Sequence, residues 1–163
     1  MKQLYNENNM KVSKVSRNND NLDINLNNDN LDINLNWDYN ISFGEIPYRI
    51  NILAKKVGDD LLVNIIGGTK PHIGAVALAQ YHPSISDMTA ASASTSLMVI
   101  PPHKEGDVAM KVSDELARVC KTNVITTAGI HIDDASTAEI KQLIENMWGA
   151  LSKLKSQLLK EQQ

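Results

Sequence analysis

The spacing of apolar residues divides the chain after about residue 36 into seven elements. Five segments alternate apolar with polar residues or form short apolar runs, which is typical of β-strands, and two repeat apolar residues every three or four positions, as helices do. The predicted strands are Tyr48–Val57, Leu61–Ile66, Ile73–Tyr81, Thr89–Ile100 and Asn123–Ile132, and the predicted helices are Asp107–Lys121 and a segment from Ser136 to about Leu158. The order β-β-β-β-α-β-α predicts a single α+β domain over residues 37–160. We expect a mostly antiparallel sheet of five to six strands with two helices packed on one face.

The last predicted helix has an unusually long apolar stripe. Ser136 and Glu139 have the spacing of a capping box, which predicts where this helix begins. Its apolar positions keep alternating four-and-three spacing for more than five turns: Ile140, Ile144, Met147, Leu151, Leu154 and Leu158. That length exceeds what one small sheet needs. The far end of the stripe is either a site for a partner helix or part of the core with a frayed terminus.

Residues 1–36 differ in composition from the rest of the chain. They contain twelve asparagines, and the nonamer at residues 19–27 is repeated without change at residues 28–36. Leucine and isoleucine alternate with polar residues in both copies, so a turn at residues 27–30 would allow a hairpin. An isolated hairpin is marginal in water, and we therefore expect a disordered, low-complexity tail.

Composition excludes several classes of function. A formal net charge of −3 at pH 7 provides no basic surface for nucleic acid or for an anionic membrane. No apolar run approaches the length that crosses a bilayer, and the first residues lack the hydrophobic stretch of a signal peptide. The single cysteine, Cys120, lies on the apolar stripe of a predicted helix and cannot form an intrachain disulfide. We expect a cytoplasmic protein.

Three of the four histidines lie in short segments rich in glycine and proline. The segments are residues 67–74, 101–106 and 129–134, and they carry His72, His103 and His131. If successive strands reverse direction and the first helix returns the chain, then strand five runs the same way as strand four, beside or near it. All three segments then meet at one edge of the sheet, where both helices begin.

This edge has the chemistry of a ligand site. Helix N-termini favour anions, and Lys70 and Lys104 add positive charge, so a phosphate-bearing ligand is expected there. Three histidines also resemble a zinc site, with Glu105, Asp133 and Asp134 as further donors. However, no two histidines have the HxH or HxxxH spacing that places two ligands on one element, and we expect neither a bound metal nor a catalytic residue. No Gly-x-Ser-x-Gly elbow, phosphate-binding loop or dinucleotide fingerprint is present.

The three motifs together resemble one small family. Gly67-Gly68 with Pro71-His72-Ile73-Gly74, then Pro102-His103-Lys104-Glu105, then Gly129-Ile130-His131 occur in the order seen in prenylated-flavin chaperone-like proteins. The resemblance covers about residues 45–157. Members of this family are small accessory subunits of gallate-type hydroxyarylic acid decarboxylases, and their fold is related to that of proteasome assembly chaperones. Many of them have glycine where Pro101 or Pro102 stands here.

The resemblance implies a non-catalytic helper. Such a protein would bind prenylated FMN, or its maturing form, and pass it to a UbiD-like hydroxyarylic acid decarboxylase. The residues that we expect to bind the cofactor are Gly67, Gly68, Lys70, His72, Gly74, His103, Lys104, Glu105, Gly129 and His131. Edge strands and the long last helix leave room for a homodimer.

Two other functions remain open from the residues alone. One is a small metal-assisted hydrolase or lyase that uses the clustered histidines. The other is an assembly chaperone that recognises protein surfaces through its sheet edge or its last helix.

Overall fold

The computed structural model describes residues 12–18, 21–26 and 36–161 and divides the chain into two units, residues 1–36 and 37–163. Its elements are β1 (Val12–Asn18), β2 (Asn21–Leu26), β3 (Tyr39–Phe43), β4 (Ile50–Val57), β5 (Asp60–Gly68), β6 (Ala75–Pro83), β7 (Ala91–Val99), α1 (Gly106–Cys120), β8 (Val124–His131) and α2 (Thr137–Lys160). In the first unit, β1 and β2 form an antiparallel pair. The turn considered at residues 27–30 lies outside the described residues, and the disorder of the tail stays a prediction.

The second unit is a six-stranded sheet with the strand order β3-β4-β5-β8-β6-β7. Four of the five neighbouring pairs are antiparallel, and only β5 and β8 run parallel. The predicted α+β class, with a mostly antiparallel sheet, is confirmed. All five predicted strands and both predicted helices are present, with ends that differ by a few residues.

The position of β8 differs from the sequence-based prediction. The chain leaves β7 through α1 and returns as β8 between β5 and β6, with β6 separating it from β7. The connection from β5 to β6 is therefore not a hairpin, because it must cross the end of β8. The strand directions are nevertheless those expected, since β8 is parallel to β5 and antiparallel to β6. The sixth strand, β3, was not assigned from the sequence, although its buried and exposed residues alternate at Tyr39, Asn40 and Ile41.

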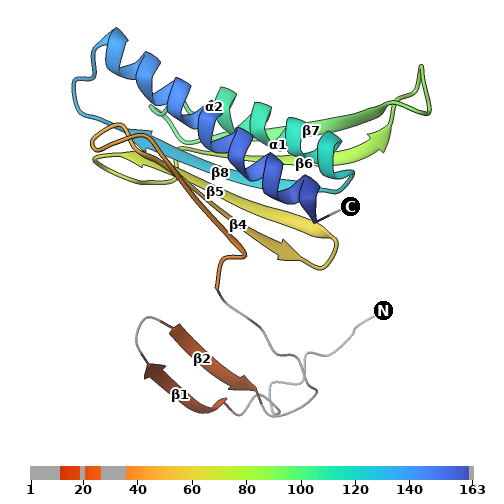
Figure 1. The fold of residues 1–163 in the computed structure, drawn as a ribbon, viewed down its shortest axis with the longest axis horizontal. Coiled ribbons are helices and arrows are strands. Elements are labelled where there is room, and N and C mark those ends of the chain that lie inside the picture. The colour runs from red at the N-terminus through yellow and green to blue at the C-terminus, as the bar shows by residue number, and fades with distance from the viewer. Residues whose placement is uncertain (1–11, 19–20, 27–35, 162–163) are drawn as a thin grey trace. The chain divides into compact units, whose positions relative to one another are not determined.

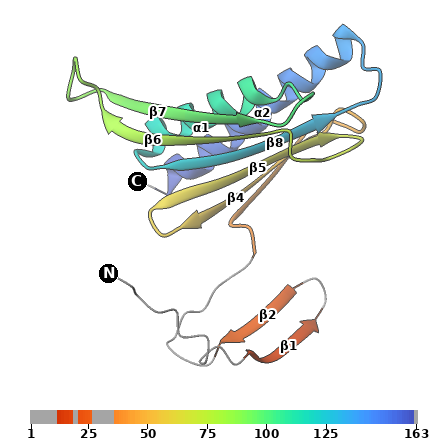
Figure 2. The same ribbon diagram turned by 180° about the vertical axis from the view of Figure 1, so that it is seen from behind.

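Both helices cover the same face of the sheet, as Figures 1 and 2 show from opposite sides. α1 packs on β6, β7 and β8, whereas α2 packs on β3 and β4. Small residues on β6 let α1 approach closely: Ala75, Ala77 and Ala79 are fully buried. Ser113 of α1 donates a hydrogen bond to the Ala77 carbonyl oxygen at 3.1 Å, which satisfies a hydroxyl inside this contact. The alanines of β6 therefore allow close packing of α1 on the sheet.

The apolar stripe of α2 is divided between the core and the surface. Its C-terminal part is buried, with Leu154 fully inaccessible and Leu158 5% exposed. At the beginning of the helix, Ile140 and Ile144 are 47% and 44% exposed. The far end of the stripe thus belongs to the core, and the unpartnered part lies near the helix N-terminus. Within the described ranges, no helix is both long enough and apolar enough to span a bilayer.

Candidate functional site

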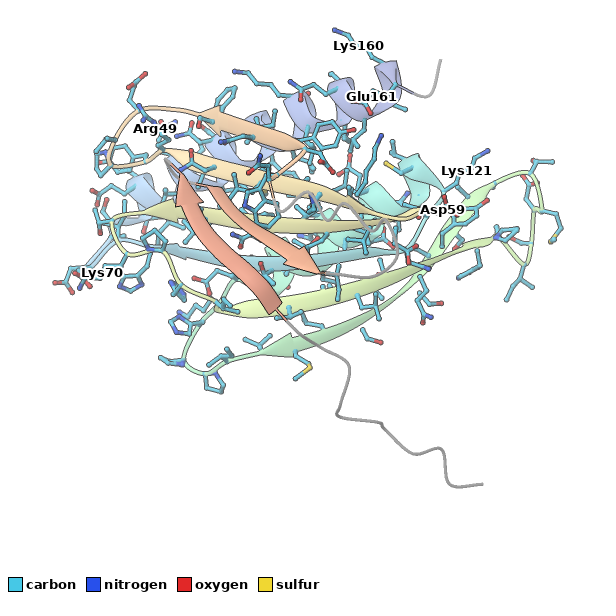
Figure 3. The ribbon with its side chains drawn as sticks, turned by 90° about the horizontal axis from the view of Figure 1, so that it is seen from below. Arg49, Asp59, Lys70, Lys121, Lys160 and Glu161 are labelled. Atoms are coloured by element: carbon cyan, nitrogen blue, oxygen red, sulfur yellow. The ribbon has the colours of Figure 1, made fainter. Side chains whose placement is uncertain are left out.

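The strand directions place the three histidine segments at one end of the sheet. The connection after β5, the segment before α1 and the end of β8 all meet there, and both α1 and α2 begin there. Figure 3 labels Lys70 at this end, whereas Asp59 and Lys121 lie at the opposite end. The ring centroids of His72 and His103 are 4.1 Å apart, and those of His72 and His131 are 5.9 Å apart. Three side chains that are distant in sequence are therefore neighbours.

Glycine at position 129 allows the connection from β5 to β6 to cross β8. A Cβ atom at Gly129 would lie 1.8 Å from the carbonyl oxygen of His72, so no other residue fits beneath this backbone. The crossing segment is fixed at both ends by backbone hydrogen bonds, from Thr69 N to the His131 oxygen and from Gly74 N to the Ala128 oxygen, both 2.8 Å long. The position of His72 therefore follows from this crossing.

The other three glycines predicted to bind the cofactor also lie against protein atoms. A Cβ at Gly67 would meet the Ile50 side chain at 2.4 Å, and one at Gly74 would meet a carboxylate oxygen of Glu105 at 2.6 Å. Gly68 has a φ of +74°, which L-residues rarely adopt, and it lies against the His131 carbonyl. These positions require glycine because neighbouring segments pack directly against their backbone. Cofactor contact at all four glycines stays a prediction.

The rings of His72 and His131 are oriented by local polar contacts, and His103 is held through its backbone. The Nδ1 atom of His72 lies 3.0 Å from the Lys70 carbonyl oxygen, and its Nε2 atom lies 3.4 Å from Oε1 of Glu105. The His103 backbone N–H closes a turn by donating to the Ile100 carbonyl oxygen at 3.0 Å. His131 Nε2 lies 3.0 Å from Oδ1 of Asp133.

The charges at this end are partly paired. Lys70 forms an ion pair with Asp133, and hydrogen bonds from Lys70 and then His131 hold the pKa of the Asp133 carboxyl below its usual value. Lys104 is exposed and has no ion pair with any described residue. Of the two predicted cationic side chains, Lys104 is therefore the one available to an anionic ligand.

The two helix N-termini at this end differ in their capping. α2 begins with the predicted capping box, in which the Ser136 backbone N–H donates to the Glu139 carboxylate at 2.8 Å. The N-cap residue of α1 is Glu105, and its side chain caps no backbone N–H of the first turn. The free backbone donors at the start of α1 are thus better placed for an anion than those of α2.

A cavity of about 390 Å³ opens between the first turns of the two helices and the end of β8. Its walls are largely apolar, and four polar residues line it as well: His103, Lys104, Glu105 and His131. The lining residues are Pro102, His103, Lys104, Glu105, Val108, Ile130, His131, Ile132, Ala135, Ile140, Leu143, Ile144 and Met147. A largely apolar pocket of this size, with a few convergent polar groups, is typical of small-molecule sites.

The apolar wall of this cavity was not predicted from the sequence. Ile140 and Ile144 belong to the stripe of α2 that was recognised as too long for the sheet, but its far end was considered instead. The fourth histidine, His82, is near the opposite end of β6, where its Nε2 atom lies 3.1 Å from the Ser94 hydroxyl. It pairs with Ser92 across β6 and β7.

Comparison with known proteins identifies the family. A family model described as the prenylated flavin chaperone LpdD-like domain matches residues 44–159. The chain belongs to this family. The resemblance drawn from the three histidine motifs is thereby confirmed.

Individual relatives are distant. Protein LpdD of Lactiplantibacillus plantarum is 28% identical over 100 residues, which cover 57% of this chain and 65% of LpdD. The chain thus spans just under two thirds of the length of this relative. It is also similar to a chain from the crystal structure of a chaperone complex for yeast 20S proteasome assembly. That similarity has a TM-score of 0.48 and 11% identity, and it covers 74% of this chain and 95% of the yeast chain.

Proposed function

We propose that this protein binds prenylated FMN in the cavity between α1 and α2 and delivers it to a UbiD-like hydroxyarylic acid decarboxylase, without catalysing a reaction itself. The observation that carries the proposal is the position of this apolar cavity beside the three histidines and the start of α1. Membership of the prenylated flavin chaperone family supports the choice of ligand.

The cavity suits the two chemical parts of a flavin nucleotide. The apolar side chains of Val108, Ile140 and Ile144 would contact the flat ring system. The phosphate would lie at the start of α1, where Lys104 and the free backbone donors can bind it. His103 and His131 line the same cavity and would donate hydrogen bonds to polar atoms of the ring or phosphate.

Purification of the protein in the presence of prenylated FMN tests this function. We expect the protein to retain the chromophore through gel filtration and to show its visible spectrum. The proposal would be contradicted if the protein elutes without chromophore at prenylated FMN concentrations at which an apo-decarboxylase takes up the cofactor.

A matched pair of variants tests the location of the binding site. Ile144→Glu places a carboxylate in the cavity wall at a half-exposed position, and Ile85→Glu makes the same change where the side chain is 95% exposed, outside the cavity. Because burying a charge against an apolar ring is costly, we expect flavin affinity to fall at least about tenfold in Ile144→Glu and to stay unchanged in Ile85→Glu. Equal affinities in the two variants would exclude this cavity.

Delivery also requires a surface that docks on the decarboxylase. β7 is an edge strand, and its C-terminal half exposes Leu97, Met98 and Val99 immediately before the His103 segment. An edge with free backbone groups and apolar side chains is a natural partner surface. We propose that the decarboxylase contacts this edge, so Met98→Lys should slow cofactor transfer without weakening flavin binding. A homodimer stays a prediction, which light scattering on the purified protein would test.

A further inference from the structure

His72, His103 and Glu105 form a cluster in which the flavin proposal gives a role to His103 alone. One ligand atom from each residue can be chosen so that all three atoms lie within 4.8 Å of one another. The side chains are well shielded, with 22% of His72 and 11% of Glu105 exposed. Two segments supply them: the connection that crosses β8 and the segment that leads into α1.

The hydrogen bond of His72 determines which of its nitrogens carries a proton. A carbonyl oxygen only accepts hydrogen bonds, so the Nδ1 atom 3.0 Å from the Lys70 oxygen must donate. In the neutral ring, Nε2 then presents its lone pair to the Glu105 carboxylate oxygen at 3.4 Å. Two acceptors that face each other repel, and the shielded site makes this repulsion stronger.

Two atoms of this cluster are buried without hydrogen-bond partners among the described residues, His72 Nε2 and Glu105 Oε2. Buried polar atoms are nearly always satisfied, so two unpaired acceptors require a hydrogen-bond donor or a cation between them. The 3.4 Å between His72 Nε2 and Glu105 Oε1 exceeds the length of about 2.7–2.9 Å that a direct charge-assisted hydrogen bond would have.

We propose that His72, His103 and Glu105 bind one divalent transition-metal cation of the zinc type. Two imidazoles with one carboxylate are typical zinc ligands, and nitrogen donors disfavour Mg²⁺ and Ca²⁺. Bound ligand atoms lie about 3.4 Å apart around tetrahedral zinc, so side-chain rotations that move the atoms by roughly 1 Å complete the site. The Lys70 carbonyl holds the His72 ring in the tautomer that ligates through Nε2.

The cation would leave one coordination position for an oxygen ligand. Because His103 and Glu105 also line the cavity, the ion lies at its rim. There it neutralises Glu105 at the start of α1 and offers a positive charge to an anionic ligand. This last role, unlike cation binding itself, rests on the proposed function.

The test uses the full-length protein without a histidine tag and without flavin. After dialysis against a chelator, Zn²⁺ is titrated in competition with a chromophoric chelator, and Co²⁺ is added separately to record its visible d–d spectrum. We expect one equivalent of Zn²⁺ to bind and the spectrum of four-coordinate Co²⁺. Affinity should fall at least about 100-fold in His72→Ala and His103→Ala and at least about tenfold in Glu105→Gln, because each change removes a direct ligand.

His82→Ala is the matched control, because His82 lies outside the cluster and should leave Zn²⁺ affinity unchanged. Circular dichroism checks that each variant is folded, and Glu105→Gln tests the site with minimal change of shape. Failure of the wild-type protein to bind stoichiometric Zn²⁺, or equal affinity in Glu105→Gln and wild type, overturns the proposal. Flavin titration in excess chelator is a separate measurement, so loss of metal binding and loss of flavin binding can be distinguished.

Discussion

Replacement of Gly129 by alanine tests whether the crossing over β8 positions the site. The new Cβ atom would lie 1.8 Å from the His72 carbonyl oxygen, whereas ordinary contacts begin near 3.4 Å, so the crossing segment must move by about 1.6 Å. Overpacking of this kind costs about 1–3 kcal/mol, and we expect about 2–3 kcal/mol because a backbone group rather than a flexible side chain must move. For a domain of this size, the melting temperature should fall by about 6–15 °C.

Urea unfolding followed by circular dichroism measures the loss of stability, and flavin titration at a temperature where the variant is folded measures the effect on the site. We expect both to be impaired, since the shift displaces His72, whose ring packs against the cavity-lining rings of His103 and His131. Gly58→Ala is the control: nothing lies within 4 Å of its added Cβ, and its φ of +61° alone should cost about 1 kcal/mol. Stability of Gly129→Ala within about 0.5 kcal/mol of wild type would refute the crossing argument. A destabilised variant with normal flavin affinity would refute the claim that the crossing positions the flavin site.

Three further predictions concern the phosphate and the start of α2. Lys104→Ala should weaken binding of FMN several-fold but leave riboflavin unaffected in parallel titrations, whereas Lys160→Ala should change neither. Loss of the N-cap in Ser136→Ala should cost about 1 kcal/mol of unfolding free energy in urea. Hydrogen bonds from Ser136 and Tyr48 lower the pKa of Glu139 below its ordinary 4.5, so the folded protein resists protonation there. That stability is present above pH 4.5 and is lost as the pH falls below it, and Glu139→Gln should flatten this part of the stability–pH profile.

Chain direction was the part of the fold that the sequence predicted best. Hydrophobic periodicity located seven elements. Counting the reversals of chain direction between them then showed which strand ends lie at the same edge of the sheet. The clustering of His72, His103 and His131 followed from this count. The order of strands in the sheet did not follow, because alternation of apolar and polar residues predicts a strand but not which strands pair with it. Gly129, in the middle of a strand pattern, is the residue that signals close backbone approach, and it lies where the crossing occurs.

The cavity could be predicted only in part. The excess length of the α2 stripe was visible in the sequence, but which end lacks a partner depends on how far the sheet extends beneath the helix. Leu154 and Leu158 are covered, and Ile140 and Ile144 are not. The pairing of Lys70 with Asp133 was also invisible, since both residues were expected at this end but their contact depends on loop conformation.

A crystal structure of the protein with prenylated FMN bound is the most direct measurement of the central claim. The ring should lie between α1 and α2 against Ile140 and Ile144, with the phosphate beside Lys104 at the start of α1 and His103 and His131 within hydrogen-bonding distance of the ligand. A cofactor bound on the sheet face opposite the helices, or at the end of the sheet near Asp59, would contradict the account.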